Sequence, residues 1–381
     1  MTIKVWDYIE EYEDEKAEIL AAIDKVMHSG RLILGESVHS FEAAFASYCG
    51  VKHGIGVDNA TNGLFLALNA LGIGQGDEVI TVSNTAVPTV CAIVSAGATP
   101  VFVDICPRTY LMDTSKLEVA VTPRTKCILP VQLFGQCVDM DEINAVAKKH
   151  SLRVLEDCAQ AHGASQKGRK AGSMSDLAVF SFYPTKPLGG YGDGGMVVTD
   201  SDELNAKLRR LRFYGMETNY YAEEHGYNAR LDELHAEILL RKLAHLERYI
   251  ADRRALAERY YHMLGNTSLI LPMVPNDNSH VFYIFVARHP ERDRIISELK
   301  ERDILVNISY PWPIHTMRGY SFLGYKEGDF PETEKAAREI FSLPMYPKLS
   351  FQDQDKVCEA LGEILGESDR INEETNIVNR A

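Results

Sequence analysis

The chain has 381 residues, of which 45% are hydrophobic and 25% charged, and its formal net charge is -14 at pH 7. This composition is that of a folded globular protein longer than one typical domain, which excludes disordered, fibrous and repeat architectures. The negative charge disfavours binding to nucleic acid or to an anionic membrane surface, because both attract positively charged proteins.

The cysteines and the first residues indicate the compartment. The seven cysteines are scattered, odd in number and never form a C-x-x-C pair, so neither a disulfide framework nor a zinc site is expected. The opening MTIKVWDYIEEYEDEK is acidic, whereas a secretion signal would be basic and then apolar, and no apolar run approaches the roughly 18 residues of a membrane span. We therefore expect a cytoplasmic protein without a metal ion.

Approximately the first 240 residues predict a parallel sheet covered by helices. Residues 14–28 carry apolar side chains at helical spacing and precede a loop with two glycines. From residue 53 onward, short apolar runs typical of strands alternate with helical segments, as far as a strand at 177–183. This alternation is typical of α/β domains.

The rest of the chain predicts a second, smaller domain. Residues 232–264 have no glycine or proline, which favours a long helix, interrupted once at most, that links the domains. A strand at 280–288, a helix at 293–303, a strand at 304–310 and two further helices follow. We expect a large domain over 1–245 and a small C-terminal α/β domain over 246–381.

Lys186 lies in the segment SFYPTKPLGGYGDGG, directly after a predicted strand. The glycine-rich stretch 189–195 that follows it lets a ligand approach the backbone closely. A lysine that forms a Schiff base with a cofactor needs that access. The segment alone is equally compatible with a solvated lysine in a flexible turn.

Asp157 ends the predicted strand in VLEDCAQAHGA, and a loop with Gln160 and His162 follows. Open α/β sheets bind ligands at the carboxyl ends of their strands. In pyridoxal 5'-phosphate (PLP) chemistry, a carboxylate beside the pyridine nitrogen keeps that nitrogen protonated, so that the ring becomes an electron sink. Asp157 suits this role, whereas Glu156 should point to the opposite face of the strand. A capping role in the next turn explains Asp157 equally well.

The segment GIGVDNATNGLFLALNALG predicts a strand, a polar turn and a helix that begins near Ala60 and Thr61. Free N–H groups at a helix N-terminus favour a phosphate, and the hydroxyls of Thr61 and Ser181 could add donors. Helix capping alone would also explain the turn. The segment is neither a G-x-G-x-x-G fingerprint nor a Walker A loop, which disfavours a nicotinamide enzyme or an NTPase.

In their order and spacing, these segments resemble the DegT/DnrJ/StrS family of sugar aminotransferases. The likeness runs over nearly the whole chain and includes GRLILGESVHSFEAAFA, DNATNGL, LPVQLFGQ, EDCAQAHGA, SFYPTKPLGGYGDGG and GYNARLDELHA. The resemblance implies the aspartate aminotransferase type of fold (PLP fold type I), with a mostly parallel seven-stranded sheet and a small C-terminal α/β domain. It also implies a homodimer with active sites shared between subunits.

The resemblance assigns roles to individual residues. It implies that Lys186 carries PLP as a Schiff base, that Asp157 pairs with the pyridine nitrogen and that Gln160 contacts the ring hydroxyl. It places the phosphate on Ser181 and the Ala60–Thr61 turn, with Asn228 reaching the phosphate of the neighbouring subunit. The residues expected to contact the substrate are His162, Tyr183, Tyr310 and His315, although His162 and Tyr183 could equally be packed core side chains.

The residues after Lys186 bear on which sugar carbon is aminated. Members that aminate carbon 4 tend to read TTGEGG there and those that aminate carbon 3 tend to read LGxxGDGG, whereas this chain reads LGGYGDGG. We therefore expect conversion of a dTDP-3-keto-6-deoxyhexose to a dTDP-3-amino-3,6-dideoxyhexose, with L-glutamate as amino donor. A 4-keto nucleotide sugar, a 3-keto UDP-sugar and a PLP-sensing regulator are the alternatives. Sugar dehydratases of the family carry histidine at the lysine position, so Lys186 argues against that activity.

The chain departs from the family pattern at two positions. Ala86 stands where relatives usually carry an aromatic residue that stacks on the pyridine ring, and Gln132 replaces the histidine of PVHLYG. We expect one face of the ring to be less well covered. Arg31, Arg212, Arg230 and Arg318 are candidate partners of the diphosphate that the sequence does not rank.

Overall fold

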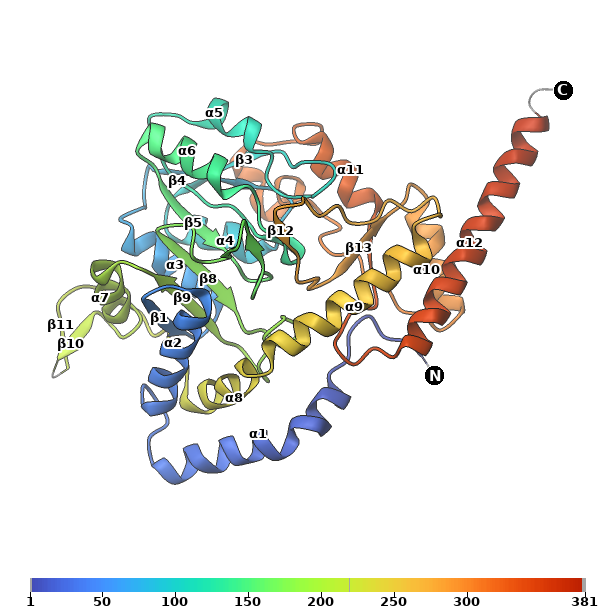
Figure 1. The fold of residues 1–381 in the computed structure, drawn as a ribbon. Helices are drawn as coiled ribbons and strands as arrows, with labels where there is room; N and C mark the ends of the chain where they lie inside the picture. The colour runs from blue at the N-terminus through green and yellow to red at the C-terminus, as the bar shows by residue number, and fades with distance from the viewer. Residues whose placement is uncertain (1, 219, 379–381) are drawn as a thin grey trace.

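A computed structural model describes residues 2–218 and 220–378, with side chains described as far as residue 366. A seven-stranded sheet forms its centre, in the order β1-β9-β8-β5-β4-β2-β3 (Figure 1). The strands are β1 (His53–Val57), β2 (Glu78–Val82), β3 (Thr99–Val103), β4 (Thr125–Ile128), β5 (Arg153–Asp157), β8 (Leu177–Ser181) and β9 (Gly195–Thr199).

The sheet is mostly parallel, as the sequence predicts. The neighbours β3, β2, β4, β5 and β8 are parallel, whereas β9 pairs antiparallel with both β8 and β1. Strands β2, β8 and β9 are buried along their whole length, which explains their continuous apolar runs. The carboxyl ends of β2, β4, β5 and β8 therefore meet at one edge of the sheet.

Helices pack on this sheet and lead chain segments to that edge. Helix α3 contacts β1, β5, β8 and β9, α4 contacts β3, and α6 contacts β4 and β5. The helices of this part are α1 (Ile9–Ser29), α2 (Glu36–Cys49), α3 (Ala60–Ala70), α4 (Val87–Ser95), α5 (Leu117–Ala120), α6 (Met140–His150) and α7 (Asp202–Leu211). Short elements between them are η1 (Thr114–Lys116), η2 (Leu133–Gly135), β6 (Ser165–Gln166), β7 (Arg169–Lys170), β10 (Met216–Thr218) and β11 (Tyr221–Ala222).

The predicted long helix is interrupted once, between α8 (Glu233–Leu243) and α9 (Leu246–Leu264). Helix α9 runs from the sheet to the C-terminal part (Figure 1). Its residues Leu246 and Ile250 belong to the hydrophobic cluster around the sheet, whereas Leu256 and Tyr260 belong to a second cluster. The domain boundary at residue 245 stays a prediction.

The C-terminal part contains a two-stranded antiparallel sheet of β13 (Phe285–Arg288) and β14 (Ile340–Leu343). Its other elements are β12 (Asn278–Ser279), α10 (Arg292–Glu301), η3 (Ile314–Thr316), η4 (Arg318–Leu323), α11 (Pro331–Glu339) and α12 (Phe351–Val378). The strand predicted at 280–288 begins only at Phe285, because Phe282 has a φ of 48°. The strand predicted at 304–310 is reduced to isolated bridges at Ile304 and Asn307. Among the described residues, no helix is long and apolar enough to cross a membrane.

A buried ion pair ties α7 to α2 and β1. Glu42 accepts hydrogen bonds from the guanidinium of Arg212 and from the Gly56 N–H, the latter at 2.8 Å, and Arg209 reaches its second oxygen at 2.9 Å. Burial alone would raise the pKa of Glu42, but His39, these two arginines and the Gly56 N–H lower it to about 2. Arg212 is 3% exposed, so it is not available to a diphosphate.

Replacing Glu42 with glutamine should destabilise the fold in a pH-dependent way. The pKa of Glu42 is lower in the folded chain than in the unfolded chain, so its stabilisation is complete at pH above about 4.5 and is lost as pH falls towards 2. We expect Glu42→Gln to lower the free energy of unfolding by about 3 kcal/mol at pH 7. Urea unfolding at pH 7 and pH 3 measures this difference, which should shrink at pH 3; an equal difference at both pH values would contradict the prediction.

Candidate active site

A cavity of about 280 Å³ opens at the carboxyl ends of β5 and β8. Its walls come from the start of α3, the turn before α4, the loop after β5 and the segment after β8. The sequence-predicted residues that line it are Ala60, Thr61, Asp157, Gln160, Ser181, Tyr183 and Lys186. The other lining residues are Asn59, Leu64, Thr85, Ala86, Pro88, Val131, Ala159 and Asp193.

Lys186 enters this cavity from a tight turn after β8. Its backbone N–H donates to the Tyr183 carbonyl at 2.9 Å. The turn then folds back so closely that a Cβ at Gly189 would lie 2.2 Å from the Pro184 carbonyl oxygen, which only glycine permits. The Lys186 Nζ lies 4.4 Å from the centroid of the Tyr283 ring. Burial alone would raise the pKa of Tyr283, but the charge of Lys186 and the hydroxyl of Thr185 lower it.

Asp157, the last residue of β5, is a buried carboxylate at the floor of the cavity. It accepts hydrogen bonds from the Thr89 hydroxyl at 2.7 Å and from the Ala159 N–H at 3.1 Å. Burial raises the pKa of Asp157, against the effects of these two donors and of the Lys186 charge. A cationic group placed against Asp157 would favour its charged form.

The N-terminus of α3 forms the polar end of the cavity. The side chain of Asn59 caps the helix by accepting from the Asn62 N–H at 2.9 Å, so this cap uses neither the Ala60 nor the Thr61 N–H. A Cβ at Gly195 would lie 2.9 Å from the Ala60 nitrogen, so glycine lets β9 approach this turn. Ser181 contributes a hydroxyl from the end of β8. Helix N–H groups and hydroxyls together suit an anion such as a phosphate.

Gln160 is held by two hydrogen bonds on the loop after β5. The Phe134 N–H donates to its Oε1 at 2.8 Å, and its Nε2 donates to the Tyr310 hydroxyl at 2.6 Å. Tyr310 thus lies against Gln160, and it is not among the residues that line the cavity.

The sequence profile of the DegT/DnrJ/EryC1/StrS aminotransferase family matches residues 13–362. The chain belongs to this family. It is 57% identical over 371 residues to a dTDP-3-amino-3,4,6-trideoxy-alpha-D-glucose transaminase of Micromonospora megalomicea subsp. nigra, which covers 96% of this chain and 99% of that protein. It is 45% identical to a "Pleiotropic regulatory protein" of Geobacillus stearothermophilus, over 95% of this chain and 98% of that protein.

The fold of this aminotransferase matches a solved structure of the family. The crystal structure of DesV from S. venezuelae, in complex with a ketimine intermediate, superposes with a TM-score of 0.94 at 42% identity and covers 95% of this chain and 98% of that chain. The family and the type of fold predicted from the sequence are therefore confirmed.

The cavity fits the cofactor of this family. A lysine, a buried carboxylate, a side-chain amide and a helix N-terminus all line one space. The donors and acceptors are of the kinds that PLP needs, and burial raises the pKa of Asp157, so a cationic ring nitrogen placed against it would favour its charged form.

Besides Tyr310, three predicted residues do not line the cavity: His162, His315 and Asn228. His162 is 0% exposed, packs against Phe45, Phe180 and Phe182, and has a pKa that burial and the Lys186 charge lower to about 3. His162 is thus a packed core residue in this structure, and its contact with the sugar stays a prediction.

His315 and Asn228 also lie outside the cavity. His315 is buried between the Ser83 hydroxyl at 2.7 Å and the Glu334 carboxylate at 3.1 Å, so it joins η3 to the end of β2 and does not face the cavity. Asn228 is exposed and bridges to Phe213. Its role towards a neighbouring subunit stays a prediction.

The structure explains the departure at position 132. The Gln132 amide donates to Glu156 at 2.7 Å and accepts from the Val138 N–H at 2.7 Å. Glu156 points away from the cavity, as predicted, and also accepts from Gly172, Met174 and Ser175. Gln132 therefore supports the opposite face of the sheet and leaves the cavity unaffected, whereas Ala86 lines the cavity.

Sequence reasoning missed Thr89 and Tyr283. Thr89 contacts Asp157 from α4, and Tyr283 packs against Lys186 from the C-terminal part. Both residues are far from their partners in sequence and belong to ordinary apolar segments, so no motif marks them.

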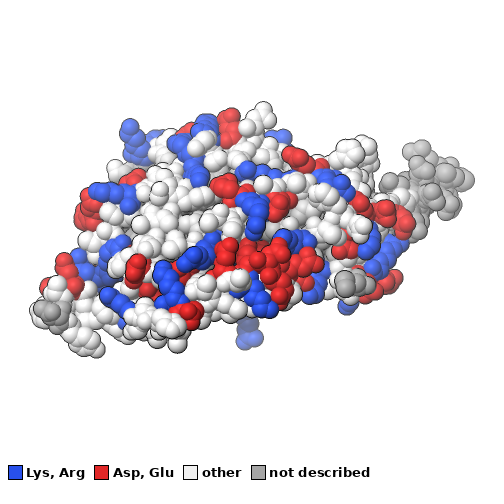
Figure 2. All heavy atoms as spheres, turned by 60° about the horizontal axis from the view of Figure 1, so that its bottom comes forward, with Lys and Arg blue, Asp and Glu red and all other residues white. Residues whose placement is uncertain are grey.

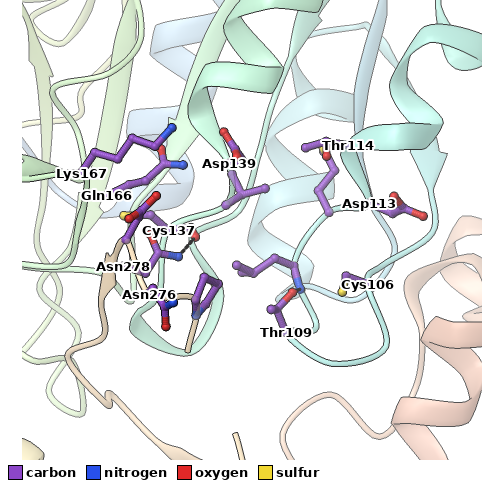
Figure 3. Close-up of a pocket in the computed structure, with 15 residues that line it drawn as sticks. Cys106, Thr109, Asp113, Thr114, Cys137, Asp139, Gln166, Lys167, Asn276 and Asn278 are labelled. Atoms are coloured by element: carbon purple, nitrogen blue, oxygen red, sulfur yellow. Dashed lines mark hydrogen bonds between the residues drawn. The ribbon is translucent and has the colours of Figure 1, made fainter. Parts of the chain in front are cut away.

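A second cavity, of about 340 Å³, lies among loops on another part of the molecule (Figure 3). It is lined by residues within 106–114, 137–139, 166–167 and 275–278, which belong to loops and to the ends of η1, β6 and β12. Several of its polar side chains have partners nearby: the Asn278 Nδ2 donates to the Cys137 carbonyl at 2.7 Å, Asp139 caps α6, and Lys167 pairs with Asp141 at 2.8 Å. No group of metal-ligating side chains occurs in the part of the chain that the structure describes. The cavity at Lys186 is therefore the better candidate.

Proposed function

We propose that this aminotransferase uses PLP to transfer an amino group to carbon 3 of a dTDP-linked 3-keto deoxy sugar. The observation that carries the proposal is the convergence of Lys186, Asp157 and the N-terminus of α3 on one cavity, in a chain 57% identical to a dTDP-3-amino-3,4,6-trideoxy-alpha-D-glucose transaminase. The LGGYGDGG segment after the lysine supports the same carbon.

In this proposal, the residues of the cavity bind the cofactor, and one of them also transfers protons. Lys186 would hold the cofactor covalently, and its Nζ would be the base that takes up and returns a proton. Asp157 would stabilise a positive charge at the ring nitrogen, Gln160 would donate to the ring oxygen, and Ser181 with the Ala60–Thr61 turn would bind the phosphate. When bound, PLP supplies the electron sink that makes loss of a proton from the amino-bearing carbon feasible.

The amino donor and the assembly belong to the same proposal. We expect L-glutamate as donor and a homodimer in which Asn228 of one subunit reaches the phosphate of the other. Two exposed apolar side chains support a covering subunit: Tyr183, which lines the cavity, is 53% exposed, and Val87, between the lining residues Ala86 and Pro88, is 42% exposed. Sedimentation of the purified protein should give twice the chain mass; a monomer would contradict the assembly.

Absorbance of the purified protein tests the proposal. A Schiff base between PLP and Lys186 is yellow, and borohydride should remove its colour by fixing the cofactor to the lysine. Glutamate should also discharge the yellow form. A protein that neither binds PLP nor changes colour with any amino donor would contradict the proposed function.

The name of the Geobacillus stearothermophilus relative, "Pleiotropic regulatory protein", is a reason to test the alternative that this chain is a PLP-sensing regulator. On the face that includes α1, acidic side chains gather in a dense cluster (Figure 2), and the net charge of the chain is -14. Neither feature attracts DNA. A gel shift with promoter DNA tests this alternative, and we expect no complex.

A cytoplasmic location stays a prediction and agrees with a nucleotide-linked substrate.

A further inference from the structure

Two aromatic residues beside the cavity adopt a backbone conformation that large side chains rarely have. The φ angles of Phe134 and Tyr310 are 61° and 60°, in the left-handed region that favours glycine. The two residues are distant in sequence, yet their rings stack with centroids 6.2 Å apart and an interplanar angle of 16°. Such conformations persist where the surrounding structure enforces them, and they concentrate at functional sites.

Phe134 and Tyr310 share one partner, the amide of Gln160. The Phe134 N–H can only donate, so the Gln160 atom 2.8 Å from it must be the oxygen. The Gln160 nitrogen therefore faces the Tyr310 hydroxyl, at 2.6 Å. An amide nitrogen carries two hydrogens, and Tyr310 takes one of them. Because Gln160 also lines the cavity, the group it can offer there is the second N–H, a donor whose direction the two bonds fix.

The Tyr310 hydroxyl stays neutral in this position. Burial, together with the nearby Tyr283 and Asp157, raises the pKa of Tyr310. The hydroxyl accepts from Gln160 because the amide nitrogen can only donate, and it keeps its own hydrogen in doing so. Its bond to Gln160 and its absence from the cavity wall set Tyr310 apart from Tyr183, which does line the cavity.

We propose that Tyr310 is a positioning residue that acts on the cofactor through Gln160 and does not bind the sugar nucleotide. The inference rests on the proposed function, since it concerns how the chain holds PLP. Phe134 and Tyr310 bind the oxygen and the nitrogen of the Gln160 amide. The orientation of this amide is therefore fixed before the cofactor binds, and its free N–H would point to the ring oxygen. Preorganised donors bind more tightly because less freedom is lost on binding.

The test compares the Kd of PLP between variants of two tyrosines, Tyr310 and Tyr110, whose rings both contact Phe134. Tyr310→Phe removes the partner of the Gln160 nitrogen and keeps the ring. Tyr110→Phe is the matched control, because Tyr110 also has a positive φ of 62° and packs edge-to-face on Phe134, but its hydroxyl is not a partner of Gln160. We expect Tyr310→Phe to raise the Kd of PLP for the apoenzyme about tenfold, measured by absorbance titration, and Tyr110→Phe to change it less than about twofold.

Two further measurements distinguish this inference from a direct contact of Tyr310 with the sugar nucleotide and from an effect that does not pass through Gln160. The KM for the dTDP-3-keto sugar should stay within about twofold in Tyr310→Phe, and the effect on the Kd of PLP should vanish when Gln160→Ala is already present. An unchanged Kd, an effect that persists without Gln160, or a large rise confined to the KM would each overturn the inference and leave the proposed function standing. Failure of the wild-type chain to bind PLP would overturn both.

Discussion

Replacing Lys186 with alanine is expected to abolish transamination, with a loss of about 10⁴-fold or more in turnover. Lys186 is the only lysine that lines the cavity among the described residues, and no other side chain of that wall offers an amine. The variant should also lose the borohydride-stable attachment of PLP. Its turn is held by backbone hydrogen bonds, so the fold should survive.

The control for this experiment is Lys167→Ala, which removes a surface lysine whose partner is Asp141. It should retain both activity and covalent cofactor. Turnover of pure Lys186→Ala near the wild-type rate, with the contents of the active site verified by mass spectrometry, would remove the basis of the assignment.

The second large effect is expected from Asp157→Asn, which keeps the shape of the side chain and removes its charge. A neutral amide cannot stabilise a protonated ring nitrogen, so we expect turnover to fall by about 10³-fold. The new amide oxygen can still accept from the Ala159 N–H, and the Thr89 hydroxyl can accept from the amide nitrogen, so thermal unfolding should change little. Steady-state rates measure the fall in turnover, and thermal unfolding curves measure whether the stability is unchanged.

Glu156→Gln is the matched control on the same strand. Glu156 faces the opposite side of the sheet and accepts from two backbone N–H groups, Gln132 and Ser175. Its replacement should lower stability and leave the rate per folded molecule near that of the wild type. If Asp157→Asn and Glu156→Gln lowered the rate equally, Asp157 would have no special role at the cofactor.

The sequence predicts the parts of the site that depend on local structure. Asp157 ends a strand, and Lys186 and the Ala60–Thr61 turn each follow one; parallel strands bring their carboxyl ends to one edge. Their meeting in one cavity therefore follows from the order of the elements. The alternation of side chains along β5 also places Glu156 and Asp157 on opposite faces, as the structure has them.

Other features depend on contacts that no local pattern reports. His162 follows Asp157 closely in sequence, but the loop turns its ring into the aromatic core around Phe45. The predicted strand at 304–310 is reduced to isolated bridges at Ile304 and Asn307, and Tyr310 at its end has a left-handed φ of 60° and stacks on Phe134. Likewise, Tyr283 reaches Lys186 from the C-terminal part only because the chain folds back over the sheet.

The sequence prediction and the Micromonospora relative differ in the substituent at carbon 4 of the sugar. The Micromonospora relative is a transaminase of a 3,4,6-trideoxy sugar, whereas the sequence prediction is a 3,6-dideoxy sugar. The two products share the amine at carbon 3, which is the feature that the LGGYGDGG segment predicts. Ala86 in the cavity wall leaves more room than an aromatic residue would, so both sugars should be tested as substrates.

A single turnover with enzyme carrying the aminated form of the cofactor tests the central claim most directly, because it does not depend on the identity of the amino donor. The enzyme would be mixed in turn with a dTDP-3-keto deoxy sugar, a dTDP-4-keto sugar and a 3-keto UDP-sugar, and the products analysed by NMR. We predict that the dTDP-3-keto sugar alone reacts rapidly and that its amine is at carbon 3. An amine at carbon 4, or faster amination of the UDP-sugar, would contradict the account.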